Sequence, residues 1–488
     1  MQKTNRQKNI NLKKKWYRDA RTYFVGFLFL LMLMIILQLF IVKIIPMKYI
    51  LTAIVVMAPL AYVLWWLQFG KRVNKVNRTL GKILIVFFCA LLIMGNLYIN
   101  KAGNTIGKIT GSDTETDSMS IIVMKNSSFE ELSDLTNARF GANETTDKEN
   151  IEETKKDITD QIGSDYSYQS FDSYEAQAKA LYEGTIDAMI LNEAYRGLME
   201  NSHPKFDDET KVIYTFEITK KVKAISKNVD VTNTPFNVYI SGIDTYGPVT
   251  TKSRSDVNMI ATINPNTHQI VLTSIPRDFY ISQTCQAGAK DKLTHTGIFG
   301  VDCTISSVEQ FFGIDINYYA RVNFTSLIDI VDALGGVTVD NPVAFTASDG
   351  TYSYEAGQVY MDGAKALRFA RERSNLSGGD RDRGKNQMRV LTAMINKAIS
   401  PAIITNYTGI MNAVGGSFQT NMSSGEISSL INMQLDEMSG WNIEQQAVNG
   451  SGDTLYSPAN GFNSYMMVPD MDTVNAAVSR IKAVLNTK

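Results

Sequence analysis

The sequence predicts an α/β protein in which three membrane-spanning helices precede two α/β domains that lie outside the membrane. Residues 1–100 carry fifteen Lys and Arg against one acidic residue, whereas residues 101–488 carry 33 basic and 48 acidic residues. The first hundred residues also contain three long apolar stretches, and strand-like and helix-like runs alternate after residue 120. These observations exclude a single soluble domain, and 488 residues leave room for two to four domains of about 100–200 residues each.

The apolar stretches cover about residues 24–45, 49–69 and 82–99. Each can cross a hydrocarbon core of about 30 Å as a helix, in which the backbone polar groups pair with one another. Any one of them could instead be a buried globular helix, but three in succession favour membrane spans.

Basic residues predict the orientation of these spans. Eight precede the first span and four lie between the second and third, but only two, Lys43 and Lys48, lie near the junction of the first and second. The positive-inside rule therefore places the N-terminus in the cytoplasm and the main domains outside the cell membrane. The basic tail is expected to face the anionic surface of the lipid bilayer, and no nucleic-acid partner is expected.

Composition divides the rest of the chain into four segments. Residues 101–119 are rich in Gly, Ser, Thr and Asp and predict a linker. An accessory α/β domain is expected at 120–225, and it shows no catalytic pattern. A stronger strand pattern begins the main domain at 232–400. Residues 401–488 contain two helix-like stretches and are expected to close the main domain as a helical and loop extension.

Three predicted strands bring charged residues to one edge of a sheet in the main domain. Apolar residues alternate at 236–240, and the apolar runs 257–263 and 269–275 flank an Asn-Pro-Asn-Thr turn, which predicts an antiparallel hairpin. If the first strand also pairs antiparallel with the second, four charged residues meet at one edge: Asp244, Arg254, Asp256 and Arg277.

A second group of charged residues lies at the start of a predicted helix. The apolar stripe of this helix continues backward, at helical spacing, through Gln387, Arg383 and Asp380. Polar side chains on an inward face indicate a site, and a helix N-terminus favours an anion. Arg371 and Arg373 lie just before this helix.

Several arginines that face two aspartates suit a phosphorylated substrate and a divalent metal. Guanidinium forks bind phosphate oxygens bidentately, and paired carboxylates suit Mg, or Mn, together with phosphate oxygens. The combination predicts phosphoryl transfer from a pyrophosphate or phosphodiester. A surface network of Arg and Asp ion pairs is the alternative. Lys292 and His295 could border the site, as could Asp380.

These motifs resemble those of the LytR-CpsA-Psr (LCP) family, in particular the streptococcal-type CpsA proteins of capsule loci. The matching motifs are Gly242-Ile243-Asp244, Arg254-Ser255-Asp256, Ser274-Ile275-Pro276-Arg277-Asp278, Lys292-Leu293-Thr294-His295, and Arg371-Glu372-Arg373 with Asp380-x-x-Arg383-x-x-x-Gln387. The resemblance implies an LCP-type α/β domain with a mixed central sheet flanked by helices. It also implies a membrane-anchored phosphotransferase that moves a glycopolymer, such as capsular polysaccharide, from a polyprenyl pyrophosphate carrier to cell-wall peptidoglycan.

The resemblance also implies residue roles. Asp244 and Asp256 would hold Mg, and Arg254 would assist the chemistry together with Arg277 and Asp256. The pyrophosphate would be bound by Arg277, Arg371, Arg373, Arg383 and Gln387. The polyprenyl tail would lie in an apolar tunnel between sheet and helices. Since no activated serine or cysteine is visible, we expect direct attack by an acceptor hydroxyl.

A non-catalytic regulator is the alternative function. Such a protein would sense lipid phosphate through the same residues, or influence gene expression of the capsule or envelope pathway through its basic tail. The predicted cytoplasmic segments are short and contain no helix-turn-helix pattern, although specific reading of DNA usually needs a folded element in a groove.

Cys285 and Cys303 lie in the exterior portion, where oxidation is possible, on either side of an expected loop. We predict a disulfide between them, the alternative being two separate small residues. The double substitution Cys285→Ser/Cys303→Ser should lower the free energy of unfolding by about 3 kcal/mol, because the bond restricts the unfolded chain. It should leave the Asp and Arg site able to operate. Intact mass after alkylation without reductant checks the bond, and two freely labelled exterior thiols would contradict it.

Overall fold

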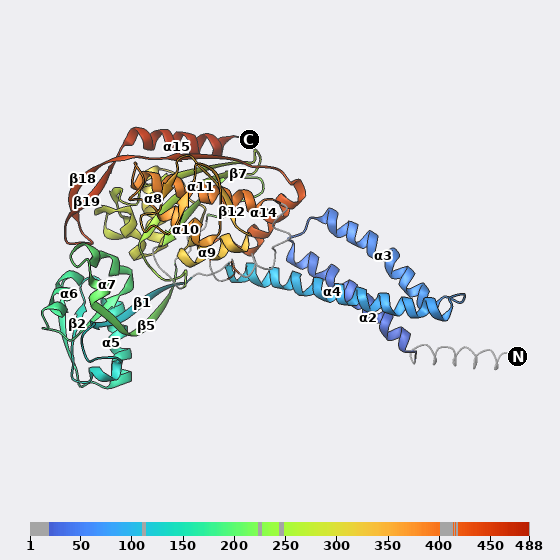
Figure 1. Ribbon diagram of the computed structural model, residues 1–488, viewed down its shortest axis with the longest axis horizontal. Helices are drawn as coiled ribbons and strands as arrows, with labels where there is room; N and C mark the ends of the chain where they lie inside the picture. The colour runs from blue at the N-terminus through green and yellow to red at the C-terminus, as the bar shows by residue number, and fades with distance from the viewer. Residues whose placement is uncertain are drawn as a thin grey trace. The chain divides into compact units, whose positions relative to one another are not determined.

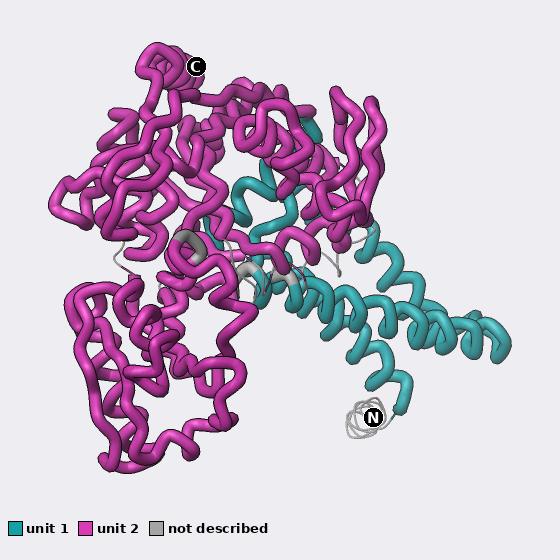
Figure 2. Tube along the Cα trace, turned by 60° about the vertical axis from the view of Figure 1, so that its left-hand side comes forward, with its two compact units in different colours: residues 1–107, 423–439 teal, residues 108–422, 440–488 magenta. Residues whose placement is uncertain are grey.

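The computed structural model describes residues 19–109, 114–222, 227–243, 248–400, 413, 415 and 418–487. The chain forms two compact units, residues 1–107 with 423–439 and residues 108–422 with 440–488 (Figure 2). The first unit contains the apolar helices, and the second contains the two α/β domains.

Three long helices make up most of the first unit: α2 (Ala20–Val42), α3 (Met47–Phe69) and α4 (Lys75–Ile109). Each is long and apolar enough to cross a membrane, with mean hydropathy of 2.9, 2.2 and 2.2. The first helix ends three residues before the predicted limit, because Lys43 adopts a left-handed conformation with φ of 54°. Most of their large apolar side chains are exposed, as expected where lipid is the solvent.

Among the described residues, the first unit also contains the helix α14 (Ser424–Glu437). Ser423 and Glu426 form a capping box at its start. Near its end, Lys48 Nζ lies 2.9 Å from Asp436 Oδ1, so an ion pair joins this helix to the start of α3.

The accessory domain is built on a five-stranded sheet with the order β3-β2-β4-β1-β5. Its strands are β1 (Thr114–Met124), β2 (Arg139–Asn143), β3 (Ser167–Phe171), β4 (Ala188–Asn192) and β5 (Thr210–Lys221). Its helices are η1 (Leu132–Leu135), α5 (Lys148–Ile162), α6 (Tyr174–Tyr182), η2 (Glu193–Asn201) and α7 (Phe206–Glu209). Side chains alternate along β1, so Ile121 and Val123 join the apolar cluster with α5, whereas Ile122 joins the cluster with α6 and η2.

The linker predicted at 101–119 is regular where the structure describes it. Residues 101–109 belong to α4, and residues 114–119 belong to β1. Polar composition misled this prediction because polar side chains of β1 are buried in ion pairs with the main domain, such as Glu115 with Arg321.

The main domain has a mixed six-stranded sheet with the order β16-β11-β6-β7-β8-β17. Its strands are β6 (Phe236–Ile243), β7 (Ser255–Asn264), β8 (Gln269–Ile275), β11 (Tyr318–Val322), β16 (Gln419–Thr420) and β17 (Asn442–Ala447). β6, β7 and β8 are antiparallel neighbours, which confirms the predicted hairpin. β11 is parallel to β6, and β17 is parallel to β8.

Helices cover both faces of this sheet (Figure 1). On one face, Tyr239 and Ile260 pack with α8 (Val301–Phe312) and α15 (Met471–Asn486). On the other face, Met259 packs with α11 (Asp380–Ala398). The helices α9 (Phe324–Ala333), α10 (Gly363–Arg371) and α11 also share a separate apolar cluster with the ribbon of β12 (Val337–Asn341) and β15 (Gly357–Met361).

Short strand pairs complete the domain: β9 (Tyr280–Ser282) with β10 (Lys290–Lys292), β13 (Phe345–Thr346) with β14 (Ser353–Tyr354), and β18 (Gly450–Ser457) with β19 (Phe462–Pro469). The expectation of a helical and loop extension at residues 401–488 is correct for the two helical stretches, which are α14 and α15, but it missed the strands of this segment. This segment supplies β16 and β17, the two edge strands of the central sheet. Neither shows an apolar alternation, because β16 has two residues and β17 is largely polar and half-buried.

Cys285 and Cys303 are joined by a disulfide in the structure. The segment between them is not a loop, contrary to expectation. It forms η3 (Thr284–Gln286), β10 and η4 (Leu293–Phe299), and Cys303 itself lies in the first turn of α8. The bond therefore ties two regular elements together.

Asp147, at the start of α5, belongs to a polar network in the accessory domain. Its carboxyl oxygens accept hydrogen bonds from Asn192 and Asn150, both over 2.7 Å. Burial raises the pKa of Asp147 to about 6, and the negative charge of Asp117 adds to this effect. The hydrogen bond from Asn192 opposes the shift.

The raised pKa predicts a pH-dependent stability. An unfolded Asp titrates near 3.9, so between about pH 4 and pH 6 the folded protein binds this proton more tightly, and stability falls as the pH rises through that range. The loss is at most about 3 kcal/mol. Urea unfolding of the wild type and of Asp147→Asn at pH 4.5 and pH 7 measures this loss. The fall in the free energy of unfolding that is due to Asp147 should appear in the wild type only. Identical pH dependence in both proteins would contradict the prediction.

Candidate functional site

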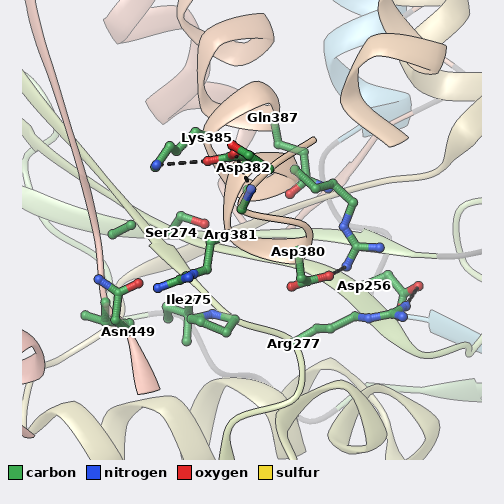
Figure 3. Close-up of a pocket in the computed structure, with 17 residues that line it drawn as sticks. Asp256, Ser274, Ile275, Arg277, Asp380, Arg381, Asp382, Lys385, Gln387 and Asn449 are labelled. Atoms are coloured by element: carbon green, nitrogen blue, oxygen red, sulfur yellow. Dashed lines mark hydrogen bonds and ion pairs between the residues drawn. The ribbon is translucent and has the colours of Figure 1, made fainter. Parts of the chain in front are cut away.

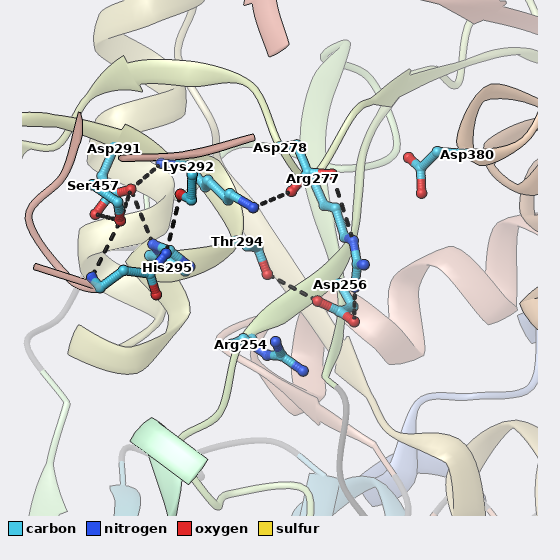
Figure 4. A network of polar contacts seen from close by, with 12 residues as sticks. Arg254, Asp256, Arg277, Asp278, Asp291, Lys292, Thr294, His295, Asp380 and Ser457 are labelled. Carbon is cyan, nitrogen blue, oxygen red and sulfur yellow. Dashed lines mark hydrogen bonds and ion pairs between the residues drawn. The ribbon is translucent and has the colours of Figure 1, made fainter. Parts of the chain in front are cut away.

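The antiparallel pairing of β7 and β8 brings two predicted site residues together. Asp256 is the second residue of β7, and Arg277 follows the end of β8 by two residues. Because the strands run in opposite directions, the start of one lies beside the end of the other. Arg277 Nη1 donates to Asp256 Oδ2 over 2.5 Å, with both side chains mostly buried (Figure 4).

Asp256 is held in its ionised form by its neighbours. Burial works to raise its pKa, but the positive charges of Arg277, Arg254 and Arg383 outweigh burial and hold the pKa below its usual range. Thr294 Oγ1, in η4, also donates to Asp256 Oδ1 over 2.9 Å. The carboxylate therefore stays charged and accepts from two elements.

The first turns of α11 bring a second set of residues to the same place. The helix begins at Asp380, whose Oδ1 lies 2.5 Å from Nη2 of Arg383. Arg383 and Gln387 line the same cavity as Asp256 and Arg277. The predicted inward register of these polar side chains thus agrees with the structure.

Arg371 and Arg373 approach from the end of α10. The Arg371 guanidinium stacks over the ring of Phe324, with Cζ 4.0 Å from the ring centroid. Both arginines line an apolar cavity that also reaches Arg254 and Asp256.

Two cavities meet at this cluster. A polar cavity of about 470 Å³ and an apolar cavity of about 590 Å³ share Asp256, Arg277, Arg383 and Gln387 in their walls. Figure 3 shows the polar cavity, with Arg277 and Asp256 at one side and the α11 side chains above. The charged residues therefore form a partition between a polar and an apolar space.

The apolar cavity lies between the central sheet and the helices α9, α10 and α11. Its apolar walls include Ile240, Val257 and Met259 from the sheet, Leu327 and Ile330 from α9, Leu367 and Ala370 from α10, and Leu391, Met394 and Ile395 from α11. Its charged end contains Arg254, Asp256, Arg277, Arg371, Arg373, Arg383 and Gln387. Such a space suits a long apolar chain that ends in a phosphate.

The three residues expected at the border of the site have different surroundings. Asp380 lines the polar cavity, and Lys292 pairs with Asp278, which follows Arg277 in the chain. His295 lines neither cavity. It is buried 3.0 Å from Asp291, which accepts from Ser457 and so ties the β18 and β19 hairpin to β10 (Figure 4).

Some residues of the polar cavity were missed by the sequence reasoning. Arg381 and Lys385, in α11, have helical spacing on a neighbouring face, and this spacing could have indicated them. Asn449 follows β17 and carries no local signal, because β17 reaches the site only by pairing with β8, which is distant in sequence.

The donor set fits Mg²⁺ bound together with phosphate. Asp256 is ionised, and its oxygens keep lone pairs beyond the bonds from Thr294 and Arg277. Asp244, its predicted partner, lies outside the described residues, and the described residues contain no group of three or more His, Cys, Asp or Glu that could hold a metal. Mg²⁺ often takes one or two carboxylates and completes its shell with substrate phosphates and water.

The family of the chain follows from comparison with known sequences. The LytR_cpsA_psr family model matches residues 202–480, more than half of the chain. The chain belongs to the LytR-CpsA-Psr family. A second model, for a DNA polymerase processivity factor, matches residues 75–191, which span α4 and much of the accessory domain. That match covers less than half of the chain and does not establish a family.

Curated relatives of the family include proteins named polyisoprenyl-teichoic acid–peptidoglycan teichoic acid transferase TagU. The protein from Oceanobacillus iheyensis is 33% identical over 234 residues, which are 46% of this chain and 70% of the relative. The protein from Enterococcus faecalis is 33% identical over 242 residues, 49% of this chain and 77% of the relative. Among solved structures, the crystal structure of Bacillus subtilis TagV is 26% identical, covers 52% of this chain and 99% of its own, and has a TM-score of 0.44.

Proposed function

We propose that this LytR-CpsA-Psr protein is a membrane-anchored phosphotransferase that moves a glycopolymer from a polyprenyl pyrophosphate carrier to peptidoglycan. One observation carries the proposal: the apolar cavity ends in a cluster of arginines beside an ionised Asp256. A lipid phosphate needs both features in one site. The names of the relatives, which describe polyisoprenyl-linked teichoic acid and peptidoglycan, support the same reaction class.

The arginines of the partition would bind the pyrophosphate and stabilise its charge. Arg277 is oriented by Asp256, and Arg383 is oriented by Asp380, so both guanidinium groups are held before substrate arrives. Such preorganised cations act most strongly on charge that develops during phosphoryl transfer. Arg371 and Arg373 would bind the same group from the α10 side.

The two cavities would hold the two substrates on opposite sides of the reacting phosphate. An acceptor hydroxyl attacks the phosphorus that carries the glycopolymer, the new O–P bond forms, and the bond from that phosphorus to the bridging oxygen breaks. Polyprenyl phosphate leaves with the bonding electrons, and the hydroxyl proton passes to water in the polar cavity. In-line attack places the entering and leaving oxygens on opposite sides. We assign the leaving lipid to the apolar cavity and the acceptor to the polar cavity.

Asp256 would hold Mg²⁺, with Asp244 as its predicted second ligand. A bound Mg²⁺ supplies neutralisation of the phosphate charge. Thr294 and Arg277 would orient the Asp256 carboxylate for this role, because both donate hydrogen bonds to it.

The membrane anchor fits the substrate. α2, α3 and α4 would cross the cell membrane with the basic tail in the cytoplasm and both α/β domains outside. The site would then meet a lipid carrier in the outer leaflet. The polymer is either capsular polysaccharide, as the resemblance to CpsA proteins implies, or teichoic acid, as in the relatives. A regulator that binds the lipid phosphate without transfer is the alternative, and a transfer assay separates it from an enzyme.

Removal of either member of the central ion pair should abolish transfer. Asp256→Ala and Arg277→Ala in the full chain should each lower the rate of glycopolymer transfer in a reconstituted assay by about 100-fold or more, because each removes one member of the ion pair that orients the charges at the phosphate. Chelation of Mg²⁺ should have the same effect. Arg480→Ala, which breaks a half-exposed ion pair with Glu444, serves as the control. Transfer at the wild-type rate by the double variant Asp256→Ala/Arg277→Ala would contradict the proposed catalytic function.

A bulky residue in the apolar cavity should weaken lipid binding. Ile395 lines the cavity, whereas its neighbour Asn396 is exposed. Ile395→Trp should lower the affinity for a polyprenyl phosphate by about tenfold or more, because its ring occupies space that the chain needs. Asn396→Trp should leave it unchanged. Equal affinity of both variants, measured by equilibrium binding in detergent, would place the lipid elsewhere.

A further inference from the structure

A backbone carbonyl of the accessory domain contacts a residue of the candidate site. Arg254 Nη1 donates to the carbonyl oxygen of Gly197 over 3.1 Å. Gly197 lies in η2, and Arg254 lines the charged end of the apolar cavity. The positive charge of Arg254 also helps to keep Asp256 ionised. A segment outside the main domain therefore contacts a residue of the phosphate site.

Because Gly197 has no side chain, the guanidinium of Arg254 can lie in the space beside it. A Cβ atom at Gly197 would lie 2.4 Å from Cζ of Arg254 and 2.6 Å from its Nε and Nη2. The φ angle of Gly197 lies outside the left-handed region, so the backbone itself does not require glycine here. Close approach of Arg254 is the feature that a side chain would disturb.

The segment that carries Gly197 is firmly held. Arg196 pairs with Glu193 within η2 and with Asp207 just after it, at 2.5 Å and 2.7 Å. Leu198 and Met199 are buried in the apolar cluster of the accessory domain. The carbonyl of Gly197 is thus a fixed acceptor.

The same cluster extends into the main domain through η4. Ile298 of η4 is buried among the accessory side chains, and a Cβ at Gly297 would lie 2.5 Å from the backbone oxygen of Ser253. Thr294, at the other end of η4, donates to Asp256. The accessory domain therefore packs on the element that orients Asp256 as well as on Arg254.

Buried ion pairs join β1 to the segment just before Arg254 and to β11. Lys252 pairs with Asp117 of β1 over 2.9 Å, and Arg321 pairs with Glu115 of β1 over 3.0 Å. The backbone amide of Lys252 also donates to the carbonyl of Thr116 over 2.9 Å. Buried pairs of this kind add little net stability but specify one arrangement of the parts they join.

We propose that the accessory domain is a positioning element of the site, and that Gly197 is the residue through which it orients Arg254. The proposal rests on the proposed transferase function, because it assigns to Arg254 an orientation that transfer needs. The domain contacts no substrate in this role. Its movement or loss would lower turnover while the lipid cavity and the other arginines stay in place.

The substitution Gly197→Ala in the full chain, reconstituted in membrane or detergent, tests this role. The three heavy atoms nearest to the added methyl group all belong to the side chain of Arg254, so we expect the guanidinium to be displaced while the backbone keeps its fold. We expect turnover to fall by about 10-fold to 100-fold, with the affinity for polyprenyl phosphate nearly unchanged. Gly440→Ala is the matched control, since a Cβ there meets nothing within 4 Å, and it should transfer at the wild-type rate.

A double-mutant cycle with Arg254→Ala separates positioning from a general structural effect. If Gly197 acts through Arg254, then adding Gly197→Ala to Arg254→Ala should change turnover no further. Wild-type turnover by Gly197→Ala, or an equal loss in both backgrounds, overturns the proposal. If Gly197→Ala alone lowers the melting temperature, Arg254→Ala must restore it by removing the clashing atoms, and failure to do so also overturns the proposal. Absence of transfer by the wild type would instead overturn the proposed function, and the melting temperatures would still test the contact.

Discussion

The charge of Asp256 is the constraint on which the site depends. A buried carboxylate is costly unless cations and hydrogen bonds compensate it, and here Arg277, Thr294 and the more distant Arg254 and Arg383 supply that compensation. Arg277 follows β8, Thr294 lies in η4 and Arg383 lies in α11, so the carboxylate on β7 brings four elements together. The arginines among the described residues of this cluster outnumber its carboxylates. The negative charge of a phosphorylated ligand would balance this excess of positive charge. The charges that make it possible to bury Asp256 would therefore also bind the substrate.

The apolar cavity exists because the helices above it have a core of their own. α9, α10 and α11 pack with the ribbon of β12 and β15 around Val331, Met361 and Phe369. They therefore do not need to collapse onto the sheet to bury apolar surface. α11 reaches the sheet through Met388, which packs against Met259. The apolar residues between these two cores line open space, which suits a lipid chain and would be costly in a protein that only had to be stable.

The accessory domain joins this arrangement through polar contacts and through Ile298 of η4, which packs in the accessory apolar cluster. Glu115 and Asp117 of β1 satisfy Arg321 and Lys252 of the main domain, and Gly197 accepts from Arg254. Each contact is made by a single side chain or a backbone carbonyl. These contacts lie in one compact unit that contains both α/β domains, next to the residues that would bind phosphate.

Local patterns in the sequence determined the membrane helices, the β6 to β8 pairing and the inward register of Arg383 and Gln387, because hydrophobic periodicity and turn chemistry act over a few residues. The motifs also indicated the members of the arginine cluster. Only the tertiary structure decided that β16 and β17 complete the sheet, that His295 belongs to a structural network with Asp291, and that Gly197 touches Arg254. These features join segments far apart in the chain through polar or backbone groups, and such pairings leave no periodic trace in the sequence. The volume of the apolar cavity was likewise decided by packing, since the same apolar stripes could have closed into a solid core.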